Sequence, residues 1–592
     1  MINEESREAF LELVRPPSNY RLNYCIGTTF SLELPCLIQL ALNSKGKKED
    51  IEQVTVYEGF EQINDFSKKA CVFTQNCRIK VLPPEIANCG NSKKGRFFSL
   101  LDGIVEEVPT ISSHSAFHPK VWFLRFDEEE GGKDPIFKLF VMSRNLTSSL
   151  KWDISACLVG KFGKPSKFCL EVRDFFKMLC RESSLKDKRN NAMKSALNDI
   201  KQIEFELPNK REFKEVDFSF KWGKVKPWEP IDYSKYRKII VISPFLSKGQ
   251  LKKLDEHSDC ILVTSKQDLD KLSDLKNIKN KTYVMSSSDM DLHAKIYFGL
   301  HGKGTDIIIG STNCTDSAWE GDNVEANIKF LAAMKAFETF KEEFIYSNGR
   351  QKDWLIPFAS AFTPTQISEE DQIKHKLDLA QGLLSTGEFK INYLKKECKI
   401  AFQGAACNLP SGVTGTLKII GVPGKVSLKT VITEGAIFSD IKKSDISSFV
   451  AIELLYKEKV REFCTVAISN INRPERNKSI LSQIIKDWAS FWDYLGVVLN
   501  FDNQPMESKG ETTTGSSPIG LNIVKRRGVS WRYLEPLLLA GANEPNIIHK
   551  IENAIKVLEE NKGNNVIHAD FANFKEFWTE YKAAFKEYKR YE

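Results

Sequence analysis

The sequence predicts an α/β protein with two similar lobes, followed by an antiparallel β domain and a helical C-terminal region. Three observations support this: a long imperfect internal repeat, strands that alternate with helical stretches in each copy, and a change to short alternating runs after the second copy. The chain has 592 residues, too many for a single hydrophobic core. We expect lobes at residues 1–165 and 231–348 with a helical connector at 166–230, a β-rich domain at 349–475 and a helical region at 476–592.

The internal repeat justifies the two lobes. In each copy an apolar strand enters a turn and a helix-like stretch, and two further apolar segments follow. These segments are Leu22–Leu42, Ala116–Phe126 and Leu139–Ser149 in the first copy, and Lys238–Leu254, Asp291–Leu300 and Asp306–Ser317 in the second. Strands separated by helical stretches predict a largely parallel or mixed sheet in each copy.

The remaining segments have simpler patterns. Arg181–Lys214 is rich in Lys, Glu and Asn with helical apolar spacing, which predicts a solvated connector helix. Residues 389–470 form short alternating runs broken by Gly and Pro, typical of an antiparallel β domain. The helical period returns from about Lys478, on both sides of the polar stretch Gln504–Gly520, which we expect to be a mobile loop.

Composition narrows the class of protein. Hydrophobic residues make up 42% and charged residues 28% of the chain, as in soluble folded proteins, and neither a signal peptide nor a membrane span is evident. Thirteen cysteines without CxxC pairs indicate buried thiols in a reducing compartment, so we expect a cytoplasmic protein. Cys71, Cys77 and Cys89 have no histidine at ligand spacing, which favours a thiol core over zinc. The formal charge of +7 permits a nucleic-acid partner without requiring one.

The same polar residues recur in the same order in both copies. Each copy has a histidine and a lysine two residues apart in a run of β-formers, followed by an apolar strand and a small polar turn. The matched sets are His118, Lys120, Ser143, Asn145 and Thr147 in the first copy, and His293, Lys295, Ser311, Asn313 and Thr315 in the second. Period-two geometry places each histidine and its lysine on one face of a strand.

This set of side chains suits phosphodiester cleavage. Two imidazoles can supply a nucleophile and an acid near neutral pH, and two lysines with two asparagines can hold the nonbridging oxygens without a metal or cofactor. One His-Lys pair in a strand is more often structural than catalytic. Two pairs, each followed by a Ser-x-Asn turn, are hard to obtain from packing alone, whereas His114 and His301 lack this context and suit surface or hydrogen-bonding roles.

The paired motifs resemble the phospholipase D (HKD) superfamily, whose signature is His-x-Lys and then a Gly/Ser-Ser-x-Asn turn, twice in a pseudo-twofold protein. The resemblance covers roughly residues 20–335. It implies that His118 attacks phosphorus to give a phosphohistidine, while His293 protonates the leaving group and then activates water. It also implies a set of residues around the phosphate: Lys120, Lys295, Asn145 and Asn313, with Ser143, Ser311, Thr147 and Thr315 as further substrate-binding candidates.

The resemblance also has departures. Glu325 matches the place where the family often has a carboxylate that orients an imidazole, but the first copy has Ser155 there, with Asp153 nearby, and its orienting group stays open. Met142 stands where the second copy has Gly310. Arg125 and Leu300 occupy the positions where many members carry an Asp after the Lys, as in the His-Lys-Asn variants such as tyrosyl-DNA phosphodiesterases and several bacterial nucleases.

The favoured function is a metal-independent nuclease with DNA as the favoured substrate. The clusters Lys93–Phe97 and Lys525–Tyr533 interleave cations with aromatic residues, as a nucleic-acid groove would. The opening of the first copy also resembles bacterial phospholipase D-like proteins of anti-phage defence or restriction, which implies a helicase or other defence-system protein as partner.

Two alternatives to the nuclease stay open. One is a phospholipase or phosphatidyltransferase, which would need a segment that meets a bilayer. The other is a nucleic-acid-binding scaffold subunit that serves a helicase partner. DNA against RNA, strandedness, endo- or exonuclease action, the function of residues 349–592 and the oligomeric state are not determined by the sequence.

Overall fold

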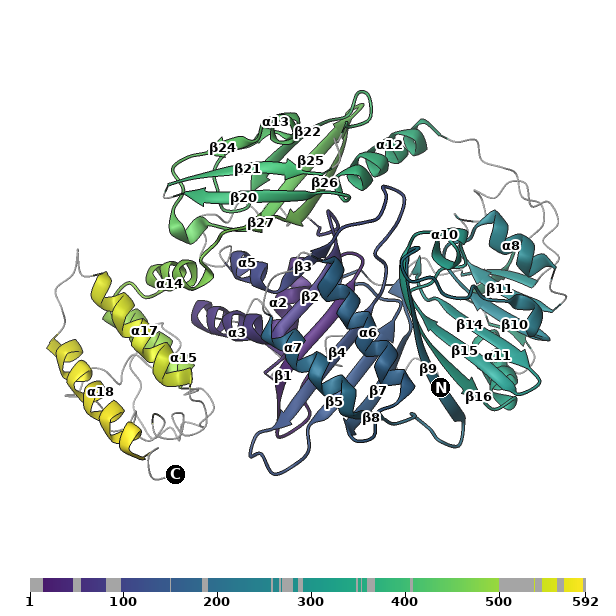
Figure 1. The fold of residues 1–592 in the computed structure, drawn as a ribbon, viewed down its shortest axis with the longest axis horizontal. Helices are drawn as coiled ribbons and strands as arrows, with labels where there is room; N and C mark the ends of the chain where they lie inside the picture. Colours follow the sequence, from purple (N-terminus) through teal and green to yellow (C-terminus); the bar gives the residue numbers. More distant parts are fainter. Residues whose placement is uncertain are drawn as a thin grey trace, which may run out of the picture.

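The computed structural model describes most of the chain as a mixed α/β protein with several sheets (Figure 1), as predicted. The Gln504–Gly520 stretch, Cys89, and the basic clusters apart from Phe97 lie outside the described residues. The described residues are 14–45, 55–80, 97–149, 151–183, 190–256, 259–265, 268, 281–285, 291–347, 350–352, 354–358, 368–394, 396–404, 408–499, 537, 546–561 and 569–588.

The first sheet has seven strands in the order β3-β2-β1-β4-β5-β7-β8. The first three are parallel and the others antiparallel to their neighbours. Their bounds are β1 (Tyr20–Thr29), β2 (Ala70–Gln75), β3 (Val105–Val108), β4 (Val121–Glu128), β5 (Ile136–Met142), β7 (Ser155–Phe162) and β8 (Ile203–Phe205).

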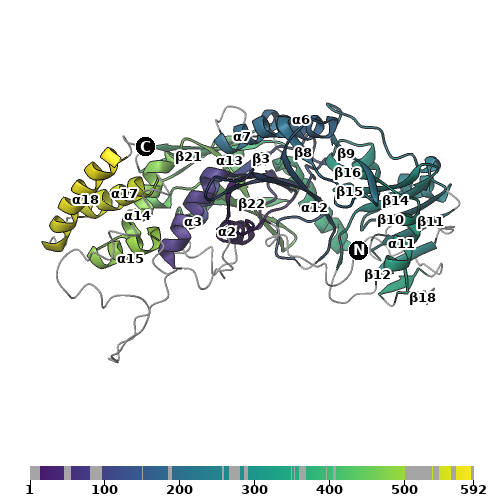
Figure 2. The same cartoon turned by 90° about the horizontal axis from the view of Figure 1, so that it is seen from below.

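Helices cover both faces of this sheet, because successive side chains of each strand point to opposite faces. Leu124 packs in the core with α2 (Leu34–Asn43) and α3 (Val56–Lys69), whereas its neighbour Phe123 packs in the core with α6 (Lys167–Glu182) and α7 (Asn191–Asp199). Figure 2 shows the two pairs of helices on opposite sides of the strands.

The second sheet has eight strands in the order β19-β12-β11-β10-β14-β15-β16-β9. From β12 to β9 it repeats the pattern of the first sheet, with three parallel strands followed by antiparallel ones. The bounds are β10 (Lys238–Ile242), β11 (Cys260–Thr264), β12 (Lys281–Met285), β14 (Ile296–His301), β15 (Gly304–Gly310), β16 (Val324–Ala332), β9 (Phe213–Trp222) and β19 (Leu355–Pro357), with helices α8 (Lys248–Asp255) and α11 (Lys335–Phe344).

The segment predicted as a helical connector differs from that expectation. Residues 166–230 contain α6 and α7 but also two strands, of which β8 extends the first sheet and β9 forms the edge of the second. The alternation in β9 explains the difference, since Phe218 and Phe220 are buried while Asp217 and Ser219 point outward. Because one apolar core includes both these phenylalanines and residues of the first sheet, the segment joins the two lobes into one packed unit.

Two four-stranded sheets form the β-rich part of the chain, which lies above the first sheet in Figure 1. Pairing is antiparallel except between β20 and β27. One sheet has β24 (Ala436–Phe438), β21 (Glu397–Gln403), β20 (Glu388–Leu394) and β27 (Ile468–Ser469). The other has β23 (Val426–Ser427), β22 (Thr414–Ile419), β25 (Phe449–Tyr456) and β26 (Lys459–Val466). The helices of this part are α12 (Glu369–Leu384) and α13 (Leu428–Thr433).

The C-terminal helices pack against the first lobe, beside α3 (Figure 1). The contact includes a fully buried ion pair between Arg476 and Asp102, at 2.6 Å, and Lys550 lies 2.8 Å from Glu61. The helices are α14 (Arg473–Ile484), α15 (Trp488–Val498), α17 (Asn546–Glu560) and α18 (Ala569–Tyr588). None of the helices in the described ranges is long and apolar enough to cross a membrane.

Candidate active site

A short parallel contact between the lobes places His118 beside Glu325. The backbone N–H of Val324 donates to the carbonyl of Ala116 at 2.7 Å, and the N–H of His118 donates to the carbonyl of Val324 at 2.9 Å. These two hydrogen bonds align Phe117 with Val324, so the next residues along the chain, His118 and Glu325, lie side by side. Nδ1 of His118 lies 3.1 Å from Oε2 of Glu325, whose side chain is fully buried.

A second parallel contact does the same for His293. Strand β13 (Asp291–Leu292) pairs with β6 (Lys151–Trp152), and the N–H of His293 donates to the carbonyl of Trp152 at 2.9 Å. Asp153 follows β6 directly, and its Oδ1 lies 2.6 Å from Nδ1 of His293. Each lobe thus gives a histidine to one pair and a carboxylate to the other. Asp153 is the orienting group that the sequence left open.

The carboxylates set the tautomer of both imidazoles. An ionised carboxylate only accepts hydrogen bonds, so Nδ1 of each ring carries the proton and Nε2 keeps its lone pair. The side chains of His118 and His293 are 11% and 10% exposed, which leaves a small part of each ring within reach of a ligand.

The two serines of the motifs hold the carboxylates. Ser143 Oγ donates to Asp153 Oδ1 at 2.8 Å, and Ser311 Oγ donates to Glu325 Oε2. Both serines are fully buried, because each follows the last residue of an interior strand. The sequence predicted that both serines would contact substrate, which stays a prediction; in the structure each serine contacts an orienting carboxylate.

The two motif lysines are buried in the same cluster. Lys120 Nζ donates to the carbonyl of His118 at 2.6 Å, and Lys295 Nζ donates to the carbonyl of His293. Burial lowers the pKa of Lys295 to about 7, although Asp153 and Glu325 oppose that shift, and burial together with Lys295 lowers the pKa of Lys120. With both lysines protonated, two ammonium groups balance two carboxylates.

Burial also keeps the imidazoles neutral. Burial and the charge of Lys120 lower the pKa of His118 to about 4, and burial and the charge of Lys295 lower the pKa of His293 to about 3. The carboxylates oppose these shifts without reversing them. Burial by itself would raise the pKa of Glu325 and of Asp153, but their contacts with the histidines and lysines lower it overall.

We expect both imidazoles to stay neutral at pH 5, where an unperturbed histidine is already protonated. Since the folded-state pKa values lie below the ordinary value of 6.5, the unfolded chain binds more protons between about pH 6.5 and 4, and stability falls as the pH drops through that window. The check is a ¹⁵N-histidine NMR titration from pH 8 to 5, with the two signals assigned from His118→Gln and His293→Gln. Titration of either signal near pH 6.5 would contradict this electrostatic description.

The two asparagines differ in their surroundings. Oδ1 of Asn145 accepts from the backbone N–H of Phe30 at 3.3 Å. Pro244 occupies the corresponding place in the second half, since Thr29 and Ser243 just before them accept equivalent backbone bonds from the two motif turns. Proline has no N–H. Oδ1 of Asn313 is accordingly buried without a hydrogen-bond partner among the described residues.

The remaining candidates lie at the edge of this cluster or away from it. Thr147 Oγ1 contacts Ser149 at 3.0 Å, and Thr315 Oγ1 accepts from Ala318 N at the start of α10 (Asp316–Trp319), so both hydroxyls serve the turns that carry the asparagines. His114 is exposed, and His301 lies 3.2 Å from Asp306.

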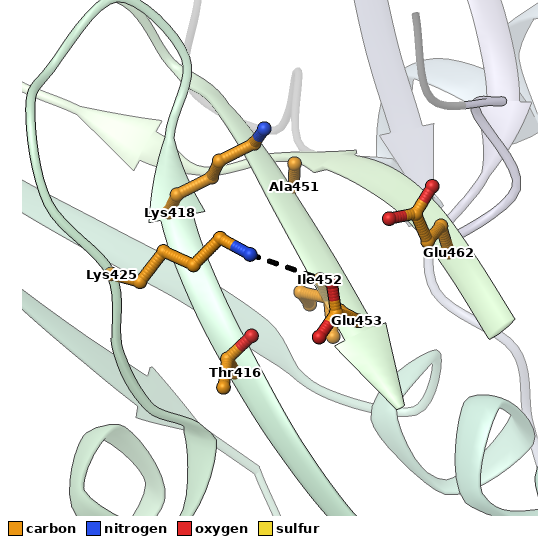
Figure 3. A pocket seen from close by; sticks show the side chains of 7 residues that line it. All are labelled: Thr416, Lys418, Lys425, Ala451, Ile452, Glu453 and Glu462. Atoms are coloured by element: carbon orange, nitrogen blue, oxygen red, sulfur yellow. Dashed lines mark hydrogen bonds and ion pairs between the residues drawn. The ribbon is translucent and has the colours of Figure 1, made fainter. Parts of the chain in front are cut away.

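Three other observations concern metals, thiols and pockets. No group of three or more His, Cys, Asp or Glu side chains in the described ranges could hold a metal ion. Most of the cysteines in those ranges are buried, Cys71 and Cys77 among them. A shallow depression on the β22–β25 sheet contains none of the motif residues; Lys425 and Glu453 line it and lie 3.5 Å apart (Figure 3).

No family model and no curated protein matches the chain. Solved structures with some similarity include phosphatidylserine synthase from Haemophilus influenzae Rd KW20 (9% identity, 64% of this chain and 92% of that chain, TM-score 0.34) and polyphosphate kinase from Porphyromonas gingivalis (9%, 62% and 50%, 0.29). Another is Nuc, a phospholipase D family member from Salmonella typhimurium (20%, 22% and 90%, 0.18). At these TM-scores the similarity does not establish the family of this chain.

Proposed function

We propose that the chain is a phospholipase D-type phosphodiesterase that hydrolyses nucleic acid, with DNA as the favoured substrate, through a phosphohistidine. One observation carries the proposal: two imidazoles, each held at Nδ1 by a buried carboxylate from the opposite lobe, lie in one cluster with two buried lysines. Neither a purely structural histidine nor a binding scaffold needs this arrangement twice.

The first step uses both histidines. The Nε2 lone pair of His118 attacks phosphorus, and the bond from phosphorus to the leaving oxygen breaks as His293 gives that oxygen a proton. In the second step His293 takes a proton from water, the resulting hydroxide attacks phosphorus, and the bond to His118 breaks. Lys120, Lys295 and the amide groups of the two motif asparagines stabilise the negative charge on the nonbridging oxygens.

His293 takes up its proton from solvent when the substrate binds. When both lysines are protonated, their charges balance those of the two carboxylates, so a bound phosphodiester adds one uncompensated negative charge. That charge raises the pKa of the nearby imidazoles. The assignment of His293 as the acid and His118 as the nucleophile follows the resemblance of the paired motifs.

Support for nucleic acid as substrate comes from the net charge of +7 and from the two basic clusters in the sequence. Those clusters lie almost entirely outside the described residues. The helicase or defence-system partner, the pseudo-twofold relation of the lobes and the domain boundaries stay predictions.

The direct test is hydrolysis in excess EDTA. We expect the purified protein to cleave at least one of labelled single-stranded DNA, double-stranded DNA and RNA under chelation, and the His118→Ala variant to cleave none. Phosphatidylcholine and phosphatidylglycerol vesicles are assayed in parallel. Cleavage of lipid alone would replace nucleic acid by a lipid substrate, and cleavage that the variant retains would exclude His118 as nucleophile.

A further inference from the structure

An aromatic ring links the candidate active site to a second cation. Phe30 is partly buried, and its ring lies edge-on to His118 with centroids 5.3 Å apart. The guanidinium carbon of Arg78 lies 5.0 Å from the centre of the same ring, within the range of a cation–π contact. Two successive contacts therefore join Arg78 to the imidazole that we assign as nucleophile.

Arg78 has no acidic partner of its own in the described part of the chain. Its Nε is buried without a hydrogen bond, and Asp378, the carboxylate whose charge acts on Arg78, is already paired with Arg461. One carboxylate thus faces two guanidinium groups, and a net positive charge remains. Arginine stays protonated even when burial lowers its pKa, so the site is cationic at any working pH.

The β-rich part of the chain holds this arginine in place. Gln381 on α12 donates to the carbonyl of Cys77 at 2.6 Å, and Asn76 donates to the carbonyl of Gly387 at 2.8 Å. The backbone carbonyl of Arg78 accepts from Leu32, next to Phe30. The segment that carries Arg78 is therefore fixed from both sides, which lowers the entropy cost of binding a ligand there.

The aromatic ring of Phe30 lies beside His118, and the matching position in the second half differs. The position that corresponds to Phe30 in the second half is Pro244, which offers neither an aromatic ring nor an N–H. In the described part of the chain, the place beside His293 that corresponds to Phe30 therefore has no aromatic ring.

We propose that Arg78, supported by Phe30, binds the phosphate adjacent to the scissile one, so that the enzyme prefers substrates with consecutive phosphodiesters. The inference rests on the proposed function and names its substrate class. A planar guanidinium matches a phosphate with two parallel hydrogen bonds. A nucleic-acid strand carries a phosphate at every nucleotide. A phospholipid with one phosphodiester offers nothing to Arg78.

The test compares binding of two ligands in the His118→Ala background, which prevents cleavage and keeps Arg78. Thymidylyl-thymidine has one phosphodiester and pentathymidylate has four; calorimetric titration gives both affinities at several salt concentrations. We expect Arg78→Gln to weaken pentathymidylate binding about tenfold and to reduce the slope of log K against log salt by about one, with the dinucleotide unaffected. Arg78→Lys keeps the charge and should keep most of the slope.

Arg181→Gln is the matched control, because it removes a guanidinium that is 59% exposed on α6, where it pairs with Glu182. It should leave both affinities unchanged. Equal losses for the two ligands, or none for either, would overturn the role of Arg78. Hydrolysis of bis(p-nitrophenyl) phosphate by the unmodified protein separates the two proposals. If the protein hydrolyses this ester but binds pentathymidylate no better than thymidylyl-thymidine, the inference about Arg78 alone is overturned. If it neither hydrolyses the ester nor binds either oligonucleotide, both proposals are overturned.

Discussion

Replacing His118 by alanine should reduce turnover by on the order of 10⁴-fold or more, because the variant lacks the imidazole that we assign as the nucleophile toward phosphorus. Replacing His293 by alanine should have a different consequence. The first step slows without the acid, by about 10²–10⁴-fold, and the second step loses its base. A substrate with a good leaving group bypasses the acid, so the His293→Ala variant should then accumulate the phosphohistidine.

The measurement uses an oligonucleotide that ends in a ³²P-labelled p-nitrophenyl phosphodiester, which supplies the good leaving group. The reaction is quenched in alkali, where a phosphohistidine survives. Label should stay with the His293→Ala protein on a denaturing gel and be lost after acid treatment. The His118→Ala/His293→Ala double variant is the control and should retain none. Label retained by His118→Ala in place of His293→Ala would exchange the two roles, and near-normal turnover by either single variant would end the two-histidine mechanism.

Replacing Glu325 by glutamine should reduce kcat by about 10²–10⁴-fold, although the side chain keeps its size. An amide can donate as well as accept, so the tautomer of His118 is no longer fixed, and the charge that stabilises its cationic form is lost. Asp153→Asn should act in the same way on His293. Steady-state rates across pH 5 to 9 check this, because loss of the carboxylate changes the pH profile, whereas a merely structural defect lowers the rate at all pH values alike.

Two serine variants show which serine acts through which carboxylate. Ser311→Ala should cost less than Glu325→Gln, about tenfold in kcat, and its effect should not add to that of Glu325→Gln, since Ser311 acts through that carboxylate. Ser143→Ala acts through Asp153, so its effect should add fully to that of Glu325→Gln. Additive effects for Ser311 and Glu325 would contradict the action of Ser311 through Glu325.

The sequence predicted the strands of the site better than the segment between the lobes. The runs around His118 and His293 alternate or are wholly apolar, and β4 and β14 follow directly after them. The stretch Arg181–Lys214 combines many charged residues with apolar residues at helical spacing, and this pattern predicts a solvated helix. The apolar alternation of β9 begins only beyond it, at Val216, and its partner β16 lies more than a hundred residues away.

Taken alone, the sequence determined the kinds of side chain in the candidate site and their order in each half. Its placement of each His-Lys pair on a strand face was wrong, because both pairs lie just before a strand, β4 or β14. Only the tertiary structure decided how the halves combine. His118 and Glu325 are 207 residues apart, and His293 and Asp153 are 140 apart. Their pairing depends on two short parallel contacts between the lobes, and such non-local hydrogen bonds leave no local periodicity by which a sequence could show them.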